Sequence, residues 1–227
     1  MNNLISVVVT CYNHEKYIEQ CLRSVFNQTY TNIELIVLDD GSTDSSTQII
    51  QEVLKDSPCE TRFETHENLG VVENRNLGLE LIRGDYLLFV DSDNYLDADY
   101  VEQLYSKLTK TNADIAYCDL FNPEKEEFYL KSREFDLTAF LNASFIDNCS
   151  LIRRSIIGNA RYDEMLNRKK LEDYDFLLNL IINNGAKAVY QSSTKLNYRV
   201  FETGSISGRD SVRYHYEIYL DILEKYL

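Results

Sequence analysis

The chain has 227 residues, 44% of them hydrophobic, and a formal net charge of −14 at pH 7. This length and composition predict one large domain with an apolar core, and the negative charge argues against binding nucleic acid or anionic membranes by bulk electrostatics. Five scattered cysteines without a Cys-x-x-Cys pair indicate reduced, buried thiols.

The N-terminal sequence does not fit a signal peptide, because its first apolar run, residues 4–9, is too short. No stretch approaches the length that a membrane-spanning helix needs. We therefore expect a cytoplasmic protein and leave open a peripheral contact with the inner face of the membrane.

Short apolar runs alternate with helical patterns in the first half of the chain. Continuous apolar runs are typical of strands in a parallel sheet, which is covered on both faces. The fold class is therefore α/β, with a mostly parallel sheet flanked by helices and with ligands at the carboxyl ends of the strands. The expected strands are 5–9, 33–38, 62–66, 86–90 and 115–117, and the expected helices are 17–26, 49–54 with its cap at Asp44 or Ser45, 71–82 and 100–108.

The second half is less regular. Residues 122–134 form a polar run that predicts a loop or hairpin. The C-terminal helix carries apolar residues at helical spacing, which indicates core packing or, alternatively, a homodimer or partner contact. The expected elements are helices at 137–142, 174–183 and 212–227 and strands at 150–153 and 188–190, and the apolar residues of the last helix are Tyr216, Tyr219, Leu220, Leu223 and Leu227.

The most informative stretch is Asp91-Ser92-Asp93-Asn94, which follows an apolar strand directly. Because side chains alternate along an extended chain, we expect Asp91 and Asp93 on one side and Ser92 on the other. Two such carboxylates suit a hard divalent cation that also binds water and phosphate oxygens. Asp, Ser and Asn are also ordinary turn formers, so neighbouring features decide between the two interpretations.

Two further strands end in polar residues. The second strand is followed by Asp40, whose carboxylate can accept a hydrogen bond from a nucleobase imide or a ribose hydroxyl, whereas Asp44 is better explained as a helix cap. The first strand ends with Thr10 and Tyr12 on one face. Tyr12 is placed to stack on a base, although any one of the 17 tyrosines is more often a packing residue.

Several segments of the first half, with their order and spacing, carry a family resemblance: SVVVTCYN (6–13), QT (28–29), VLDDGSTD (37–44), NLG (68–70), NRNLGL (74–79), GDY (84–86) and FVDSD (89–93). They resemble family 2 glycosyltransferases of the GT-A fold over residues 4–110. The second half matches more loosely, through LEDYDF (171–176) and YR (198–199). The resemblance implies one GT-A domain, 1–227, with a nucleotide-sugar-binding half at 1–110 and a smaller acceptor-binding half at 111–227.

The resemblance also implies a reaction and a set of site residues. The reaction is the inverting transfer of a hexosyl or N-acetylhexosaminyl group from a nucleotide diphosphate donor, commonly a UDP-sugar. The acceptor is a hydroxyl on a glycan, glycoprotein or lipid-linked carrier, and the cofactor is Mn²⁺ or Mg²⁺. The implied donor site consists of Thr10, Tyr12, Asp40, Arg75, Asp91 and Ser92, with Asp93 as the direct metal ligand and Asp91 between ribose and metal-bound water.

A sugar hydroxyl is a poor nucleophile until a base removes its proton. Asp173 of the Glu172-Asp173 pair matches the base of the family, although acidic residues also favour a helix N-terminus. The metal, with Arg75 or Arg199, would neutralise the leaving diphosphate.

The sequence departs from the family at the residue two positions beyond the Tyr-Arg pair. Many relatives have a histidine there, near the diphosphate, where this chain has Phe201. Either Glu202 substitutes as a ligand, or Asp93, the diphosphate and water hold the metal without it.

The sequence also admits other functions. A non-catalytic nucleotide-sugar-binding or assembly module of a glycosylation complex would explain the missing histidine. A catalytic domain that acts only with a partner would explain the apolar C-terminal helix. A nucleotidyltransferase is disfavoured, because no Gly-rich basic loop follows Val9. The sugar, nucleotide, acceptor, linkage and oligomeric state are not specified by the sequence.

Overall fold

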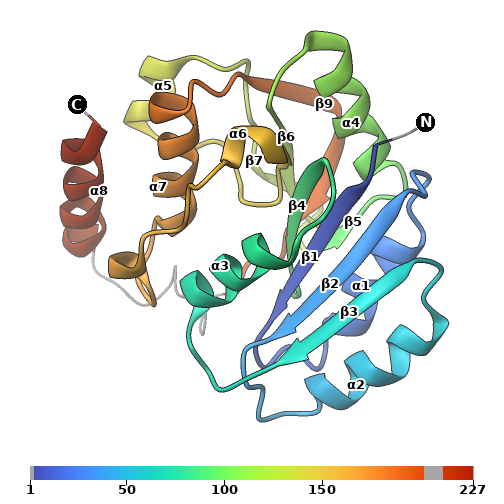
Figure 1. The fold of residues 1–227 in the computed structure, drawn as a ribbon. Helices are drawn as coiled ribbons and strands as arrows, with labels where there is room; N and C mark the ends of the chain where they lie inside the picture. Colours follow the sequence, from blue (N-terminus) through green and yellow to red (C-terminus); the bar gives the residue numbers. More distant parts are fainter. Residues whose placement is uncertain (1–2, 202–211, 227) are drawn as a thin grey trace.

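The computed structural model describes residues 3–201 and 212–226 (Figure 1). Four parallel strands form one half of its sheet: β1 (Ile5–Cys11), β2 (Ile33–Asp39), β3 (Glu60–Thr65) and β4 (Tyr86–Asp91). The other strands are β5 (Tyr95–Leu96), β6 (Ile115–Asn122), β7 (Glu127–Leu130), β8 (Leu151–Arg153) and β9 (Ala188–Asn197). The strand order is β3-β2-β1-β4-β8-β6-β9-β5, with β7 paired to β6 outside this path. The predicted α/β class is confirmed, but the sheet is mixed: β1 to β4 run parallel, whereas β5, β7 and β8 pair antiparallel with their neighbours.

Helices cover both faces of the sheet. Three of them, α1 (Ile18–Phe26), α2 (Ser46–Val53) and α4 (Tyr100–Thr111), pack in one apolar core. The other core is built by α3 (Val71–Leu81), α5 (Leu137–Asn142), α6 (Arg154–Ile157), α7 (Glu172–Leu178) and α8 (Val212–Tyr226). Short helical turns lie at Leu54–Asp56 and Glu164–Leu166, and a π-helical turn at Asn179–Asn183 extends α7.

The apolar runs explain why these strands lie inside the sheet. In β1, Val7 and Val9 face the core under α1, α2 and α4, whereas Val8 faces the other core. All three side chains are fully buried, and burial of such a side chain contributes about 1.5–3 kcal/mol. The parallel arrangement then brings the carboxyl ends of β1, β2, β3 and β4 to one edge of the sheet.

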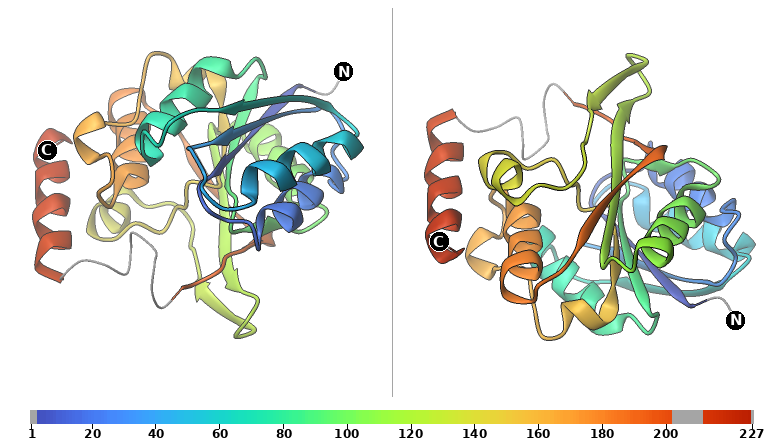
Figure 2. Two further views of the ribbon diagram at one scale, coloured as in Figure 1. Left: turned by 90° about the horizontal axis from the view of Figure 1, so that it is seen from below. Right: turned by 90° about the horizontal axis from the view of Figure 1, so that it is seen from above.

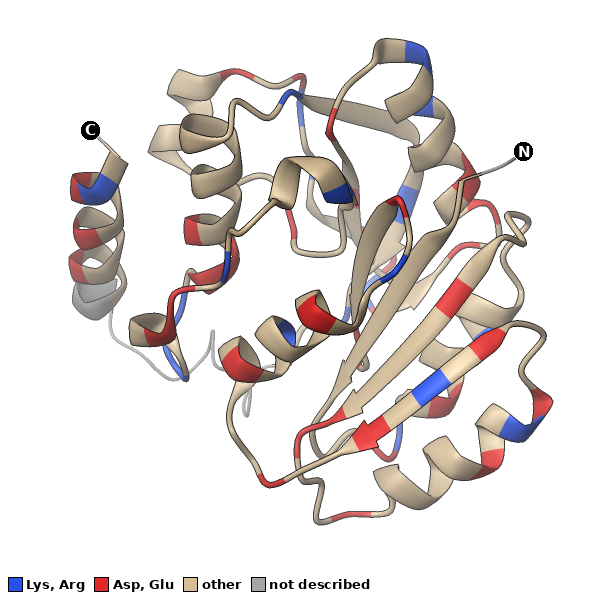
Figure 3. Cartoon of the chain, in the orientation of Figure 1, with Lys and Arg blue, Asp and Glu red and all other residues tan. Residues whose placement is uncertain are grey.

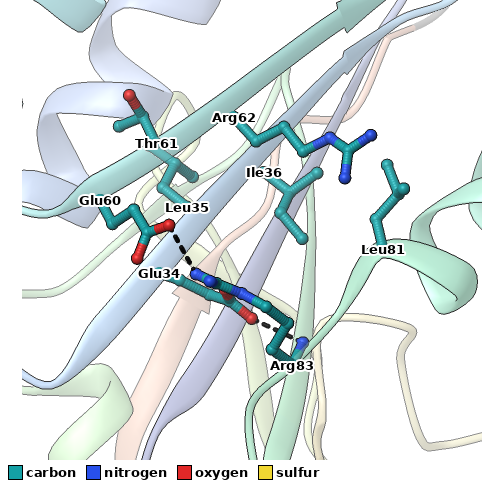
Figure 4. Close-up of a pocket in the computed structure, with 8 residues that line it drawn as sticks. All are labelled: Glu34, Leu35, Ile36, Glu60, Thr61, Arg62, Leu81 and Arg83. Carbon is teal, nitrogen blue, oxygen red and sulfur yellow. Dashed lines mark hydrogen bonds and ion pairs between the residues drawn. The ribbon is translucent and has the colours of Figure 1, made fainter.

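An ion pair between buried Glu34 and exposed Arg83 closes the opposite, amino-terminal edge of the sheet (Figure 4). The carboxylate of Glu34 accepts hydrogen bonds from the backbone N–H and Nε of Arg83, both at 2.7 Å, and from Ser6 Oγ. Burial alone would raise the pKa of Glu34, but these hydrogen bonds lower it below its ordinary value. Arg83 also contacts Glu60 Oε1 at 2.8 Å. A pocket of about 150 Å³ lies here, far from the acidic strand ends, and is part of this structural brace.

The chain turns directly after β4, which corrects one expectation. The N–H of Asn94 donates to the carbonyl of Asp91 at 2.9 Å, so residues 91–94 form a turn. The alternation of an extended strand therefore does not place Asp91 and Asp93 on one face. The turn-forming residue types decided the local backbone instead.

The second half contains the predicted hairpin and longer strands than expected. β7 pairs with β6 antiparallel across the polar run, and α5 has the predicted bounds. β6 and β9 extend well past the expected ranges, because each pairs with the other through backbone groups and does not need an apolar run to continue. The two-residue strand β5 and the one-turn helix α6 were not predicted.

The predicted apolar face of α8 is partly wrong. Among the described side chains of residues 215–226, Ile218 and Ile222 are the buried ones, whereas Tyr216 and Leu220 are 58% and 57% exposed. Tyr219 and Leu223 pack at the edge of the core, as predicted, and Leu227 lies outside the described residues. Among residues 3–201 and 212–226, no helix is both long and apolar enough to cross a membrane.

The cysteines largely agree with the prediction of reduced, buried thiols. All five cysteines are free, and four of them are buried; Cys59 is partly exposed.

Candidate active site at the carboxyl edge of the sheet

Acidic positions gather at the carboxyl ends of β2 and β3 and at the start of α7 (Figure 3). The loops at this edge are joined by side chains. Asn13, in the left-handed conformation at φ 56°, accepts the N–H of Thr43 at 2.7 Å through its side-chain oxygen. The imidazole Nδ1 of His14 lies 2.7 Å from the hydroxyl of Ser92. The loops after β1, β2 and β4 therefore form one connected rim.

Asp40 organises the loop that precedes α3. Its two carboxylate oxygens accept the backbone N–H groups of Leu69 and Gly70, at 2.7 and 3.0 Å, and the residue is 4% exposed. Each carboxylate oxygen has a second lone pair, so these bonds leave acceptor capacity for a ligand. Ser45 is the N-cap residue of α2, and Asp44, which precedes it, accepts the N–H of Ser46, the first residue of the helix, at 2.9 Å.

A buried network joins the two halves of the chain at this edge. Arg75, on α3, contacts Asp91 Oδ1 at 3.0 Å through Nη2 and Glu172 Oε1 at 2.8 Å through Nη1. Thr10 Oγ1 donates to the same oxygen of Asp91 at 3.2 Å. Arg75 thus connects the end of β4 with the start of α7.

The electrostatics of Arg75 follow from this position. Burial opposes its charge, but Asp91 and Glu172 outweigh that effect and hold the guanidinium pKa well above its ordinary value. The guanidinium carbon lies 5.6 Å from the centre of the Tyr162 ring. Its Nε is buried and has no hydrogen-bond partner among the described residues, so one donor of this cation is still free.

Several carboxylates near Arg75 have raised pKa values. Burial raises the pKa of Glu172 to about 7, and the charge of Arg75 offsets only part of this effect. Burial likewise raises the pKa of Asp173, again partly offset by Arg75. Burial and then the charge of Asp91 raise the pKa of Asp93 to about 7. Such shifts, caused by burial and like charges in one place, are typical of functional sites.

Asp147 belongs to the same cluster and was not predicted from the sequence. It lies in the loop between α5 and β8, and its Oδ1 accepts the N–H of Cys149 at 2.8 Å. Burial and then the charge of Asp91 raise its pKa to about 7. No motif marks this position, because the surrounding loop has neither strand nor helix periodicity.

Arg199 lies beside the turn that follows β4. Its backbone N–H donates to Asn94 Oδ1 at 3.0 Å, and its Nη1 donates to the carbonyl of Asp93. The guanidinium carbon lies 4.8 Å from the ring centre of Tyr17, and the ring of Phe201 packs on the same tyrosine at 5.4 Å.

The structure therefore brings together most of the predicted site residues. Asp91 and Arg75 are in direct contact, and Tyr12 is 45% exposed at the rim. Ser92 is fully buried against His14, beneath the rim, and Glu202 lies outside the described residues. The residues whose contacts or mutual charges define the cluster are Thr10, Arg75, Asp91, Asp93, Asp147, Glu172, Asp173 and Arg199.

The donor set at the turn fits a hard divalent cation. The described residues contain no group of three or more His, Cys, Asp or Glu side chains that would hold a metal on their own. Mg²⁺ and similar ions are usually held by one or two carboxylates together with substrate phosphates and water. Asp93 and Asp91 supply two carboxylates, and burial and then the charge of Asp91 raise the pKa of Asp93, which a bound cation would oppose.

Comparison with known proteins identifies the family. Residues 6–175 match the sequence model described as Glycosyl transferase family 2. The chain belongs to this family. An uncharacterized glycosyltransferase of Haemophilus influenzae is 36% identical over 78% of the chain and 72% of its own length. Glycosyltransferase GlyA of Streptococcus pneumoniae is 36% identical over 65% of the chain, but the match spans only 22% of that protein.

Further relatives and solved structures extend this comparison. The teichoic acid poly(glycerol phosphate) polymerase of Staphylococcus epidermidis is 31% identical over 78% of the chain and 26% of its own length. The crystal structure of S. aureus TarS 1-349 in complex with UDP-GlcNAc aligns with a TM-score of 0.76 at 22% identity, over 98% of the chain and 65% of that protein.

A second solved structure shares the fold at greater distance. The mannosyltransferase PcManGT from Pyrobaculum calidifontis, in complex with GDP-Man and Mn²⁺, aligns with a TM-score of 0.70 at 17% identity, over 90% of the chain and 59% of that protein. These likenesses confirm the GT-A fold of this family 2 glycosyltransferase.

Proposed function

We propose that this family 2 glycosyltransferase transfers a sugar from a nucleoside diphosphate donor, in the first place a UDP-sugar, to an acceptor hydroxyl with inversion at the anomeric carbon. One observation carries the proposal: Arg75 contacts both Asp91, a donor-side carboxylate, and Glu172, which adjoins the proposed base Asp173. These two contacts support a single site for donor binding and proton removal. The UDP-GlcNAc complex of TarS supports the choice of nucleotide.

The donor is bound by the rim of the first half, residues 1–110. The exposed ring of Tyr12 stacks on the base, and Asp40 accepts a hydrogen bond from the imide through its remaining lone pairs. Thr10 orients Asp91 toward the ribose. The second half, residues 111–227, presents the acceptor.

A divalent cation, Mn²⁺ or Mg²⁺, would be held by Asp93 and Asp91 together with the diphosphate. When bound, it would neutralise charge on the leaving group. Arg75 and Arg199 supply fixed positive charge from the protein on two sides of the same turn. The free Nε of Arg75 gives one of these cations an unused donor.

Asp173 acts as the general base. It takes the proton of the acceptor hydroxyl while that oxygen bonds to the anomeric carbon, and the bond from this carbon to the diphosphate oxygen breaks with its electron pair on the leaving group. Because attack comes from the face opposite the leaving group, the configuration inverts. Glu172, held by Arg75, fixes the N-terminus of α7 and so positions Asp173.

A donor panel tests the proposal. UDP-glucose, UDP-galactose, UDP-N-acetylglucosamine and GDP-mannose are compared by thermal unfolding with and without Mn²⁺ or Mg²⁺, since a ligand that binds only the folded state raises its stability. We expect stabilisation by at least one UDP-sugar and slow metal-dependent hydrolysis of the same donor. Binding without any turnover would favour a non-catalytic module, and no stabilisation by any nucleotide sugar would contradict the proposal.

The five free thiols support placing the reaction in a reducing compartment such as the cytoplasm.

A further inference from the structure

The hairpin of β6 and β7 projects beyond the rest of the molecule (Figure 2). Two large aromatic side chains on this hairpin, Phe128 and Tyr129, are 42% and 54% exposed. Exposed aromatic rings cost hydration free energy unless a partner covers them. The other exposed tyrosines are single residues on separate elements, so this pair is a local concentration.

The rings on the hairpin are held in place by neighbouring rings. Tyr129 stacks on Tyr198 with ring centres 5.1 Å apart and an interplanar angle of 16°. Phe128 meets Phe121 at 5.5 Å in an edge arrangement, and the ammonium of Lys131 lies 4.6 Å from the centre of the Phe128 ring. One face of Tyr129 is thus covered by Tyr198, and its exposure lies elsewhere on the ring.

Tyr198 connects these rings to the active site. Its N–H donates to the carbonyl of Phe121 at the base of the hairpin, at 2.8 Å. The next residue, Arg199, donates to Asn94 Oδ1 in the turn that contains Asp91 and Asp93. Burial and then the charges of Asp147 and Asp91 raise the pKa of the Tyr198 phenol, in agreement with a place beside the acidic cluster.

We propose that Tyr198, Tyr129 and Phe128 form an acceptor platform that binds a pyranose ring of the acceptor saccharide and leads it into the active site. The inference rests on the proposed glycosyl transfer and adds the chemical class of the acceptor. The C–H groups on a pyranose face are weakly positive and match the negative face of an aromatic ring. Rings with only two rotatable bonds, held by their neighbours, lose little conformational entropy on binding.

The charges of the hairpin favour a neutral sugar over a chain of alditol phosphates. Three exposed glutamates, Glu124, Glu126 and Glu127, and one exposed lysine, Lys125, stand at its turn, which therefore carries a net negative charge. The ammonium of Lys195 lies 3.6 Å from the centre of the Phe121 ring, and that of Lys131 lies over Phe128, so both lysines are engaged with rings. A polyanionic acceptor would meet like charge at the outer end of the platform.

The absence of tryptophan from the sequence provides a direct test. In the full-length Tyr129→Trp variant the new indole is the only tryptophan, and its emission reports a sugar ring stacked on it. The probes are cellotetraose, maltotetraose and N,N′,N″-triacetylchitotriose, with sn-glycerol 3-phosphate and sorbitol as probes without a pyranose. Tyr216→Trp is the matched control. Tyr216 is 58% exposed, close to the 54% of Tyr129, and its helix α8 lies apart from the hairpin in both views of Figure 2.

We expect a saturable emission change in Tyr129→Trp with at least one pyranose probe, and none with the two other probes or in Tyr216→Trp. The same response in both variants, a response to glycerol phosphate, or no response to any probe would overturn the inference. Circular dichroism confirms that each variant is folded. Calorimetric titration with UDP on the same samples tests the donor site separately, so loss of UDP binding and failure of the acceptor platform are distinguishable.

Kinetics with the responding saccharide as acceptor give a second readout. Tyr129→Ala should raise the KM for the acceptor about tenfold, the scale of one aromatic contact. Tyr129→Phe should retain the wild-type KM, because the ring and not the hydroxyl makes the contact. An unchanged KM in Tyr129→Ala, or equal losses in Tyr129→Ala and Tyr129→Phe, would contradict an acceptor-stacking role.

Discussion

Arg75 lies between two carboxylates from opposite halves of the chain, 3.0 Å from Asp91 Oδ1 and 2.8 Å from Glu172 Oε1. The Arg75 side chain is only 5% exposed, whereas the carboxylates of Asp91 and Glu172 are 29% and 14% exposed, so it is the guanidinium that is shielded from water. Removing one partner of a buried ion pair leaves the other charges uncompensated, and this costs more than the pair contributes when intact. Arg75 therefore holds the donor side and the base side of the site in one arrangement.

Arg75→Met tests this role. The substitution keeps much of the side-chain volume but leaves Asp91 and Glu172 without their cation, so we expect a loss of about 3–5 kcal/mol in the free energy of unfolding. Urea denaturation at pH 7 measures it. Arg62→Met is the control, because the ion pair of Arg62 with Glu64 is exposed and its loss should change stability by no more than about 0.5 kcal/mol. Equal effects of the two substitutions would show that Arg75 is not a buried bridge.

The pH dependence of turnover follows from the environment of the proposed base. Asp173 accepts a proton only when it is ionised, and burial raises its pKa. Activity should therefore fall as the pH drops, with an acid limb above the pKa of about 4 that is usual for an aspartate. The pH profile of kcat/KM measures the limb. A profile that stays flat down to about pH 4 would mean that no carboxylate of raised pKa acts as the base.

The charged side chain of Lys225 helps to attach the C-terminal helix, together with hydrogen bonds from the Tyr219 and Tyr226 hydroxyls. Lys225 lies 2.9 Å from Asp175 Oδ1 and also contacts Asp163. Burial opposes the charge of Lys225, but both carboxylates raise its pKa; that of Asp163 is lowered by the lysine despite burial.

Lys225→Met should lower the free energy of unfolding by about 1 kcal/mol at neutral pH, a value discounted because the lysine is 39% exposed. Because folding raises the pKa of Lys225, the lysine stabilises the folded state fully below its unfolded-state pKa of about 10.4. This stabilisation is lost as the pH rises through the folded-state pKa. Because folding lowers the pKa of Asp163, this carboxylate stabilises the folded state fully above its unfolded-state pKa of about 3.9. This stabilisation is lost as the pH falls through the folded-state pKa. Urea denaturation at several pH values measures the difference, with exposed Lys110→Met as the control. If the stability difference between wild type and Lys225→Met did not change with pH, the contribution of Lys225 would not come from its ion pairs.

Gly84 occupies a position where no side chain fits. A Cβ built there would lie 2.7 Å from the backbone nitrogen of Ser6 and 2.8 Å from the carbonyl oxygen of Leu4. Gly84→Ala should therefore shift β1 against β4 and destabilise the fold by more than about 2 kcal/mol. Gly185→Ala is the control, since its Cβ would meet open space and only its positive φ of 74° adds strain, about 1–2 kcal/mol. A smaller loss for Gly84→Ala than for Gly185→Ala, measured by thermal unfolding, would contradict this packing.

The sequence predicted the parallel half of the fold because its strands, such as β1, are apolar on both faces and its helices follow a clear period. It did not predict the turn at residues 91–94, since residues of that type are equally compatible with a strand end. The face of α8 was misassigned because tyrosine and leucine occur on both sides of this helix, and only packing shows that Ile218 and Ile222 are buried.

The candidate site was predicted where it follows strand ends or family motifs. The contact between Arg75 and Glu172 joins residues 97 positions apart, and no local pattern encodes such a contact. Asp147 was missed for the same reason. Its side chain reaches the acidic cluster through the fold of a loop, and the sequence around it carries no periodic signal.

Asp173→Asn provides the most direct test of the proposed chemistry. The amide keeps the shape of the carboxylate but cannot take up the acceptor proton, so kcat should fall by about 10²–10⁴-fold while the Kd for the UDP-sugar stays within about twofold of wild type. Turnover with the preferred donor and acceptor, together with calorimetric titration of the donor, measures both quantities. Asp99→Asn, at the N-terminus of α4, is the matched control and should leave both quantities unchanged. Wild-type kcat in Asp173→Asn, with the donor still bound, would contradict the central claim that Asp173 is the base.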